Sequence, residues 1–409
     1  MPPATPNSHP IPLTFPVLIK LASAGFAFFV AGNNDGSVGA LIPYILRGYN
    51  THTGSLAILY ASGFTGWVTA ALVSVYARVY IGMGGAVVLG AGLQLLAQAL
   101  RVWHPPFGLF SSTFFLAALG TALQDSQANT FVSSVKFAHR WLGIIHASYG
   151  IGCVTGPLVA TAMALSRPEK WVYFYWTLFG LGTINFALVT LAFRTDIEVG
   201  KGSEEGAEAE GRFRNAWSEM RATVKERAVW LLSLFFFFHL GVGVTSGGFL
   251  VEYLVTIRKE PLSRVGYIST SFYGGLALGR LLLAEPTFRY GERRMLLLYS
   301  FLCLVLQVVF WKAKNIVGGW IVMSCMGFLL GPYFATGVSI GTKLLPHKIH
   351  ACALGLVFVI AQAGGAIFPA ITGLIATKAG VEVLQPILIG LIVAMGSSWV
   401  LVPAPKQKG

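Results

Sequence analysis

Twelve long apolar segments dominate the sequence and limit what the chain can fold into. An α-helix needs about 20 apolar residues to cross the hydrocarbon core of a bilayer. Because lipid offers the backbone no hydrogen-bond partner, we expect each segment to form an uninterrupted helix. The predicted spans are residues 17–46, 55–77, 81–101, 107–133, 140–165, 171–193, 228–255, 263–285, 294–312, 316–342, 350–377 and 383–402.

The composition excludes most other classes of protein. Hydrophobic residues make up 55% of the chain and charged residues 11%, whereas a soluble domain carries about 25% charged residues. The net charge of +13 lies mostly between apolar segments, which predicts contact with anionic lipid headgroups and no nucleic-acid partner. The sequence contains no P-loop, HExxH, paired CxxC or GxSxG motif, so we expect no enzymatic activity, cofactor or metal site.

One polar interval divides the twelve segments into six and six. Residues 194–227 hold eight acidic and seven basic residues, and their first part, GKGSEEGAEAEG, has the composition of a flexible linker. The basic residues place this interval, and with it both termini, on the cytoplasmic side. We predict an N-terminal tail (1–16), a six-helix half (17–193), a cytoplasmic linker (194–227), a second six-helix half (228–402) and a C-terminal tail (403–409).

The two halves share residues at nearly constant offsets. At an offset of 209, Gly32, Ser37, Gly39, Leu41 and Tyr44 fall on Gly241, Ser246, Gly248, Leu250 and Tyr253, and Gly82 falls on Gly291. Gly66 falls on Gly274 at an offset of 208, and Gly152 falls on Gly364 at 212. Such a duplication predicts an all-α integral membrane protein with twelve transmembrane helices in two pseudo-symmetric halves, and a solute site between the halves near the midplane.

The fourth span carries the first candidate site. An ionisable residue within a span costs about 2.5–3.5 kcal/mol on insertion scales, so its presence suggests a function. Asp125 lies mid-way along LGTALQDSQANTFVSS and shares a helix face with Asn129, four residues on. With Gln124 it forms a polar segment that could line an aqueous cavity. The alternative is a structural clamp between helices.

The first span and several isolated polar residues add further candidates. Asp35, with Asn33 and Asn34, could bind a proton or a solute, or could tie the first span to a neighbour. Histidines change charge near neutral pH, although a lone histidine in a span is often structural. The remaining candidates for solute or proton binding are His146, Tyr149, His239, Tyr273, Tyr333 and Gln362.

One arginine near the cytoplasmic end of the eighth span suggests a gate. Arg280 could lock the cytoplasmic side by pairing with Glu285 or Glu292, or its side chain could extend to the lipid headgroups. Arg293 and Arg294 follow in the cluster YGERR and belong to the same predicted gate.

These motifs resemble those of the major facilitator superfamily. GNNDGSVGALIPYI, LGIIHASYGIGCVTGP, GGLALGRLLL, GFLLGPYFATG and GGAIFPAITGLIA are similar to segments of fungal general-substrate transporters of the bypass-of-stop-codon type, and of the fucose–proton symporter branch. The resemblance covers nearly the whole chain. It implies alternating access and a small-molecule substrate.

The resemblance also bears on single residues. Those symporters have an E-T-x-A-N-P-F pattern in the fourth span, whose acid takes part in proton coupling; here D-S-Q-A-N-T-F puts Asp125 on the acid and Asn129 on the asparagine. Asp35 matches the N-D-G variant of the fungal branch. Two positions depart from that branch, because Gly243 and Phe249 replace the acid and the tryptophan of G-V-E-x-x-x-G-G-W in the seventh span.

The function expected from the sequence is proton-coupled symport of a sugar-like or other polar solute by a monomer, with the plasma membrane favoured over the vacuolar membrane. Two alternatives remain at this point. One is an efflux antiporter for a fungal secondary metabolite, and the other is a non-transporting sensor on a transporter scaffold.

Overall fold

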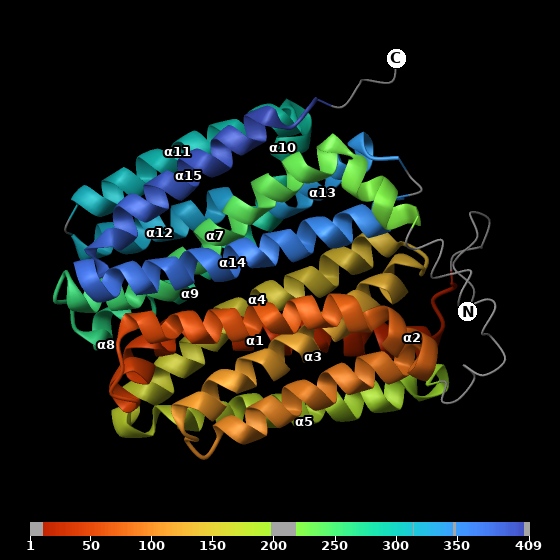
Figure 1. The fold of residues 1–409 in the computed structure, drawn as a ribbon, viewed down its shortest axis with the longest axis horizontal. Coiled ribbons are helices and arrows are strands. Elements are labelled where there is room, and N and C mark those ends of the chain that lie inside the picture. Colours follow the sequence, from red (N-terminus) through yellow and green to blue (C-terminus); the bar gives the residue numbers. More distant parts are fainter. Residues whose placement is uncertain (1–10, 198–217, 314, 347–348, 405–409) are drawn as a thin grey trace.

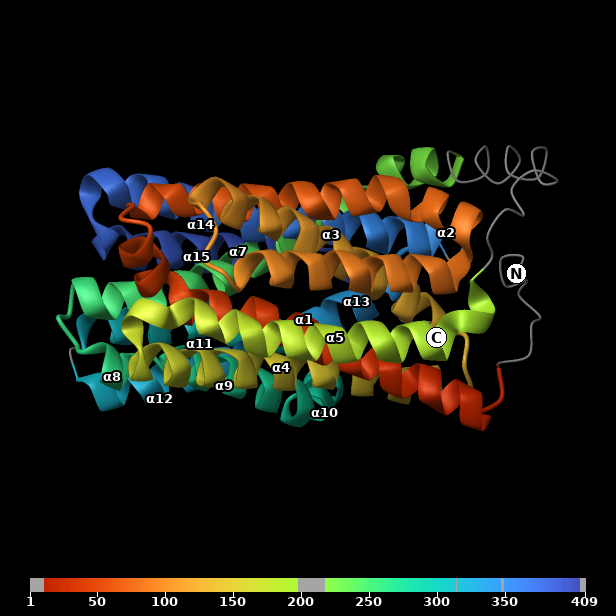
Figure 2. The same ribbon diagram turned by 90° about the horizontal axis from the view of Figure 1, so that it is seen from below.

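The protein is a bundle of helices that lie side by side along one long axis (Figures 1 and 2). The structure, a computed structural model, describes residues 11–197, 218–313, 315–346 and 349–404. Most of the predicted tails and of the predicted linker, at 1–10, 198–217 and 405–409, lies outside the described residues.

Each half consists mainly of long helices joined by short turns. The first half contains α1 (Phe15–Gly48), α2 (Leu56–Arg101), α3 (Phe107–Ser133), α4 (Ala138–Ser166) and α5 (Phe174–Phe193). The second contains α7 (Arg227–Thr256), α8 (Leu262–Val265), α9 (Ile268–Leu282), α10 (Ala284–Tyr290), α11 (Glu292–Lys312), α12 (Ile316–Leu330), α13 (Tyr333–Leu344), α14 (His350–Ala379) and α15 (Leu384–Leu401).

The expectation of uninterrupted helices is wrong for two spans. The predicted eighth span breaks at Gly266 and Tyr267 and again at Leu283, which leaves α9 with 15 residues. The predicted tenth span breaks at Gly331 and Pro332, between α12 and α13. Proline has no backbone N–H to donate, and a break at membrane depth is tolerated where protein rather than lipid surrounds it. Among the described residues, 11 helices are long and apolar enough to cross a membrane, and α9 supplies the twelfth, shorter crossing.

A glycine turns the chain at the same junction in each half. Gly82 has φ 72° and separates the second and third spans within α2. Gly291 has φ 99° and separates α10 from α11. Both values lie in the left-handed region that glycine adopts without steric cost. The offset of 209 between these residues therefore reflects an equivalent turn in the two halves.

Equivalent glycines also bring the same pairs of helices into contact. A Cβ at Gly152 of α4 would lie 2.2 Å from the Phe29 carbonyl oxygen of α1, and a Cβ at Gly364 of α14 would lie 1.9 Å from that of Phe237 in α7. Such small residues let helix backbones approach closely in a bilayer, where helices associate mainly through packing.

One predicted pairing of the repeat is wrong by a residue. A Cβ at Gly66 would lie 2.5 Å from the Phe115 carbonyl oxygen. The equivalent contact in the second half is made by Gly275, 2.0 Å from the Ser324 carbonyl oxygen, whereas Gly274 faces open space. The structural equivalent of Gly66 is thus Gly275, at the same offset of 209 as the first span.

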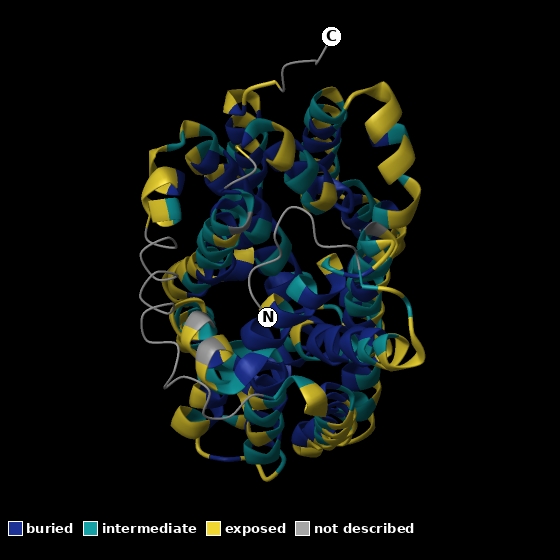
Figure 3. Cartoon of the chain, turned by 90° about the vertical axis from the view of Figure 1, so that its right-hand side faces the viewer, coloured by how far each residue is buried: buried dark blue, intermediate teal, exposed yellow. Residues whose placement is uncertain are grey.

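The surface of the bundle is apolar along its sides. Viewed from the end at which α1 begins, exposed positions lie mainly around the periphery and buried ones inside (Figure 3). Several large exposed side chains are hydrophobic, including Leu72 (68%), Leu191 (66%) and Leu281 (67%). Exposure of such an apolar surface to water is unfavourable, whereas its contact with lipid acyl chains is not.

The close approach of α7 and α14 predicts a specific sensitivity. Gly364→Ala forces a methyl group against the α7 backbone, and we expect it to lower the free energy of unfolding by about 1–3 kcal/mol, as overpacking does. Thermal unfolding of the purified protein in detergent measures this. Gly355→Ala in the same helix is the control, because its Cβ meets nothing within 4 Å. Equal melting temperatures for the two variants would contradict the packing argument.

Candidate functional site

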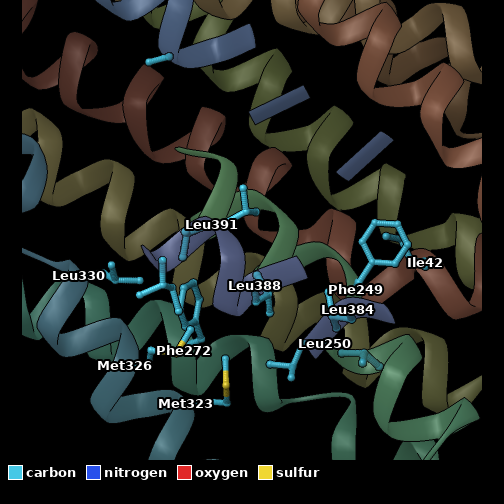
Figure 4. Close-up of a cluster of buried hydrophobic side chains, with 14 of the residues drawn as sticks. Ile42, Phe249, Leu250, Phe272, Met323, Met326, Leu330, Leu384, Leu388 and Leu391 are labelled. Carbon is cyan, nitrogen blue, oxygen red and sulfur yellow. The ribbon is translucent and has the colours of Figure 1, made fainter. Parts of the chain in front are cut away.

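The two halves are joined by a continuous hydrophobic core at one end of the bundle. Ile42, Ile45 and Leu46 near the C-terminal end of α1 belong to the same buried cluster as Phe249 and Leu250 of α7. Figure 4 shows Ile42 beside Phe249 in this cluster. A second buried cluster, nearer the start of α1, contains residues of the first half alone. The halves are therefore packed together at the end far from the start of α1, which we call the distal end.

Backbone contacts seal the distal end further. A Cβ at Gly39 of α1 would lie 1.9 Å from the Gly247 carbonyl oxygen of α7. The Thr53 hydroxyl donates to the Gly373 carbonyl oxygen at 3.1 Å, and the Thr161 hydroxyl donates to that of Gly266 at 2.8 Å. These three contacts, which we call the distal seal, each join one half to the other. The sealed end implies that any solute path in this conformation opens toward the end where α1 begins.

Asp35 is the centre of a polar cluster below the distal seal. Its carboxylate accepts hydrogen bonds from the Asn34 side-chain amide at 3.1 Å and from the Tyr149 hydroxyl at 3.0 Å. Asp35 is exposed although it lies mid-way along α1 between buried neighbours. Because its partners come from α1 and α4, the carboxylate faces a water-accessible space inside the bundle rather than lipid.

Arg101 is a member of this cluster that sequence reasoning missed. Its Nε donates to the Thr113 hydroxyl at 2.7 Å, and its Nη1 donates to the Asn34 side-chain oxygen at 2.9 Å. The guanidinium lies 4.2 Å from the centre of the Phe114 ring, and the residue is 1% exposed. An arginine at the end of an apolar segment is usually predicted to contact lipid headgroups. Arg101 is the last residue of the predicted third span, and this position was the only indication in the sequence.

Asp125 is the one acidic residue of α3. Its backbone oxygen accepts from the Asn129 side-chain amide at 3.0 Å. Among the described residues, no donor forms a hydrogen bond with its carboxylate, and the residue is partly exposed. The structure thus gives the Asp35 carboxylate two hydrogen-bond partners and leaves the Asp125 carboxylate without one among the described residues.

Arg280 lies between the halves and is not paired with the predicted acids. It lies on α9, which packs against α4 of the first half where a Cβ at Gly150 would lie 3.6 Å from the Ala277 side chain. Glu285 is bound by Arg289 at 2.6 Å, and Glu292 is bound by Lys343 at 2.6 Å. In this conformation neither acid locks Arg280.

The other two arginines of the predicted gate lie at the start of α11. Arg293 donates to the Val400 carbonyl oxygen at 2.7 Å, which ties α11 to α15 within the second half. Arg294 is exposed.

The two histidines lie in aromatic surroundings. His146 of α4 contacts the rings of Phe28, at 5.2 Å, and Phe334, at 5.8 Å between ring centres, and the second contact joins the two halves. His239 stacks on Tyr333 at 5.2 Å within the second half. His146 therefore borders the space between the halves, whereas His239 is 9% exposed and packs inside one half.

Gln124, a further predicted residue, packs between helices of the first half. Gln124 accepts from Gln94 at 2.7 Å and from Asn185 at 3.2 Å. Gln307 and Gln385 form a similar buried pair, at 2.6 Å, in the second half. These contacts between amide side chains were not predicted from the sequence, although the presence of glutamines inside apolar spans indicates that such side chains need partners.

The last predicted residues are placed as follows. Asn33 is 4% exposed and donates to the Phe29 carbonyl oxygen, and the Tyr333 hydroxyl donates to that of Leu296. The Tyr273 hydroxyl packs against Gly247 of the distal seal. Gln362 is partly exposed on α14.

Two surface grooves hold no charged side chain and do not compete as sites. One, of about 540 Å³, lies between α1 and α4 and is lined by residues such as Phe26, Phe29 and Trp141. The other, of about 410 Å³, lies between α9 and α12. In the described part of the chain, no three His, Cys, Asp or Glu side chains gather into a group that could hold a metal ion.

The distal seal predicts how the conformation responds to a bulky substitution. Gly39→Leu cannot be accommodated against Gly247, so we expect it to open the distal end. Hydrogen–deuterium exchange would then rise in residues 247–254 and 373–379 and around Thr53. Gly243→Leu in α7 is the control, since its Cβ meets nothing within 4 Å. Unchanged exchange in these segments of the Gly39 variant would show that the contact does not hold the seal.

The chain is similar in sequence to several transporters. It is 26% identical to "Bypass of stop codon protein 6" of Saccharomyces cerevisiae, with 97% of this chain and 84% of the relative aligned. It is 19% identical to the glucose/mannose transporter GlcP of Bacillus subtilis (85% and 86% covered) and 23% identical to a glucose/galactose transporter of Brucella abortus (73% and 72%).

Solved structures show the same fold at low identity. A nucleoside transporter, NupG, aligns with a TM-score of 0.73 at 14% identity, covering 95% of this chain and all of the other. A bacterial Spinster homologue in an inward-facing conformation aligns at 0.68 and 13%, covering 95% of each chain. The Escherichia coli fucose:proton symporter FucP aligns at 0.63 and 15%, covering 95% of this chain and 99% of that one.

The family comparison agrees with the two-half fold. The model of the Major Facilitator Superfamily matches residues 24–369, which include spans of both halves. Both the superfamily and the fold belong to transporters rather than enzymes. The chain is a multi-pass integral membrane protein that belongs to the Major Facilitator Superfamily.

Proposed function

We propose that the protein is a secondary active transporter that moves a small polar organic solute together with a proton. The two halves rock about the space that holds Asp35, Asp125 and Tyr149, and open it to one side of the membrane at a time. The path lies between two halves of one chain, so a monomer suffices.

The state of Asp125 is the observation that carries this proposal. A carboxylate in the membrane is costly unless it is paired or protonated. Asp125 has no hydrogen-bond donor among the described residues, so taking up a proton removes the cost of an unpaired charge. Its partial exposure gives a proton a route from water. Asp125 is therefore suited to bind and release the coupled proton.

Asp35 is suited to a different role in the same site. It already accepts from Asn34 and Tyr149, and Arg101 supplies a nearby positive charge. These hydrogen bonds hold the Asp35 carboxylate in place, so its role here is to orient and bind the solute, whereas Asp125 carries the coupled proton. Asn34, Asp35 and Tyr149 then present hydrogen-bonding groups to the solute.

The distal seal supports an inward-facing conformation. With both termini in the cytoplasm, as the basic residues of the linker favour, the open end faces the cytoplasm and the sealed end faces outward. A solute that entered from outside would leave from this state. The plasma membrane is the proposed location, with the vacuolar membrane as the alternative.

Proton movement in liposomes tests the coupling. Purified protein is reconstituted with a pH-sensitive dye inside, and glucose, galactose, fucose, gluconate and lactate are added outside in turn. We expect at least one solute to acidify the lumen, and we expect Asp125→Asn to abolish this because amides carry no titrating proton. Asp196→Asn is the matched control, since Asp196 pairs with Lys20 at the end of the bundle.

Each other result has a clear meaning. Solute-driven acidification that survives in Asp125→Asn shows that Asp125 is not the coupling residue. Solute-driven alkalinisation shows proton antiport, the mechanism of the efflux alternative.

A further inference from the structure

Arg280 is the one charged side chain of α9, and it lies at the contact between the two halves. α9 packs against α4 of the first half, where a Cβ at Gly150 would lie 3.6 Å from the Ala277 side chain. Arg280 follows Ala277 by one turn on the same side of α9, and Gly150 directly follows Tyr149, whose hydroxyl donates to Asp35. Arg280 is partly exposed. A cation therefore borders the same internal space as Asp35.

No acid neutralises this cation among the residues that the structure describes. Glu285 and Glu292 are bound by Arg289 and Lys343, and no hydrogen bond joins Arg280 to a described side chain. Arg101 provides the contrast, because it is bound by Thr113, Asn34 and aromatic ring faces. An unpaired guanidinium at membrane depth is costly, and such residues commonly mark a solute pathway.

The two halves thus hold opposite charges that the protein leaves unbalanced. In the first half, Asp35 accepts from Asn34, which in turn accepts from Arg101, whereas no described donor bonds to the Asp125 carboxylate. In the second half, no described acid pairs with Arg280. Asp125 and Arg280 form no ion pair with each other among the described residues.

We propose that the solute is an organic carboxylate and that Arg280 binds its charged group. This inference rests on the proposed function and narrows its substrate class. With a proton on Asp125 and a carboxylate on Arg280, every charge at the site is balanced. The loaded carrier then crosses between its two conformations as a neutral site.

Chemistry favours a carboxylate over a phosphate. The guanidinium fork matches the two oxygens of a carboxylate in a bidentate pair. The proton neutralises Asp125, so Arg280 alone is left to balance the solute and can balance one negative charge. A phosphate monoester carries about two negative charges near neutral pH. The proposal also departs from the relatives whose names mention glucose, mannose and galactose, which are neutral sugars.

Matched solute pairs test the binding step. The melting temperature of the purified protein is measured with glucose and glucuronate, glucitol and gluconate, and lactamide and lactate, because binding to the folded state raises it. We expect stabilisation by the carboxylate of at least one pair and none by its neutral partner. Arg280→Gln should abolish it, and Arg280→Lys should weaken the affinity about tenfold or more because lysine lacks the fork.

Arg289→Gln is the matched control, since it removes an exposed arginine that pairs with Glu285. The proposal is overturned if only neutral members stabilise the protein, if no member does, or if the carboxylate still stabilises Arg280→Gln. Stronger stabilisation by glucose 6-phosphate than by any carboxylate would overturn the choice of carboxylate.

Transport in liposomes separates this inference from the proposed function. Proton-coupled uptake of the carboxylate should not respond to a membrane potential set with potassium and valinomycin, because the loaded site is neutral. If the carboxylate binds through Arg280 but is transported without protons, the proposal of proton coupling is wrong and the proposal that Arg280 binds a carboxylate is supported. If glucose moves with protons and Arg280→Gln leaves that uptake unchanged, coupling stands and the carboxylate inference fails.

Discussion

Close approach of helix backbones at glycine is the constraint on which the rest of the structure depends. In a bilayer, two helices associate through packing rather than through hydrophobic transfer, so each contact needs complementary surfaces. Gly152 lets α4 meet α1, and Gly364 lets α14 meet α7 in the same way. The α1–α4 contact places the Tyr149 hydroxyl 3.0 Å from the Asp35 carboxylate. The polar cluster therefore depends on the close approach of two helix backbones at Gly152.

The same type of contact acts between the halves, where its consequence is different. Gly39 and Gly247 meet at the distal end, together with the apolar side chains around Ile42 and Phe249. A seal made of apolar packing and two hydrogen bonds from threonine hydroxyls to carbonyl oxygens can part without leaving buried charges unpaired. That property suits an interface that must open and close, whereas buried ion pairs across it would resist separation.

The sequence predicted the fold well because its signal is local. Twelve apolar segments and a repeat of glycines determine the two-half bundle, and the chain's membership of the Major Facilitator Superfamily confirms it. The breaks at Leu283 and at Gly331–Pro332 escaped prediction, since hydropathy continues across them. Arg101 also escaped, because its partner Asn34 lies in another helix. The contact of Asp35 with Tyr149 likewise depends on tertiary packing that no single segment encodes.

The distribution of charged side chains between the two halves bears on why the site would bind a solute. A site whose acids and bases all paired internally would be stable when empty and would have little reason to bind a solute. Here Asp35 and Arg101 are linked through Asn34 within the first half. The Asp125 carboxylate and Arg280 have no ionic partner among the described residues, and they come from different halves. In the proposed mechanism a proton binds to Asp125 and an anion binds to Arg280, so that the site carries no unpaired charge when the halves rearrange.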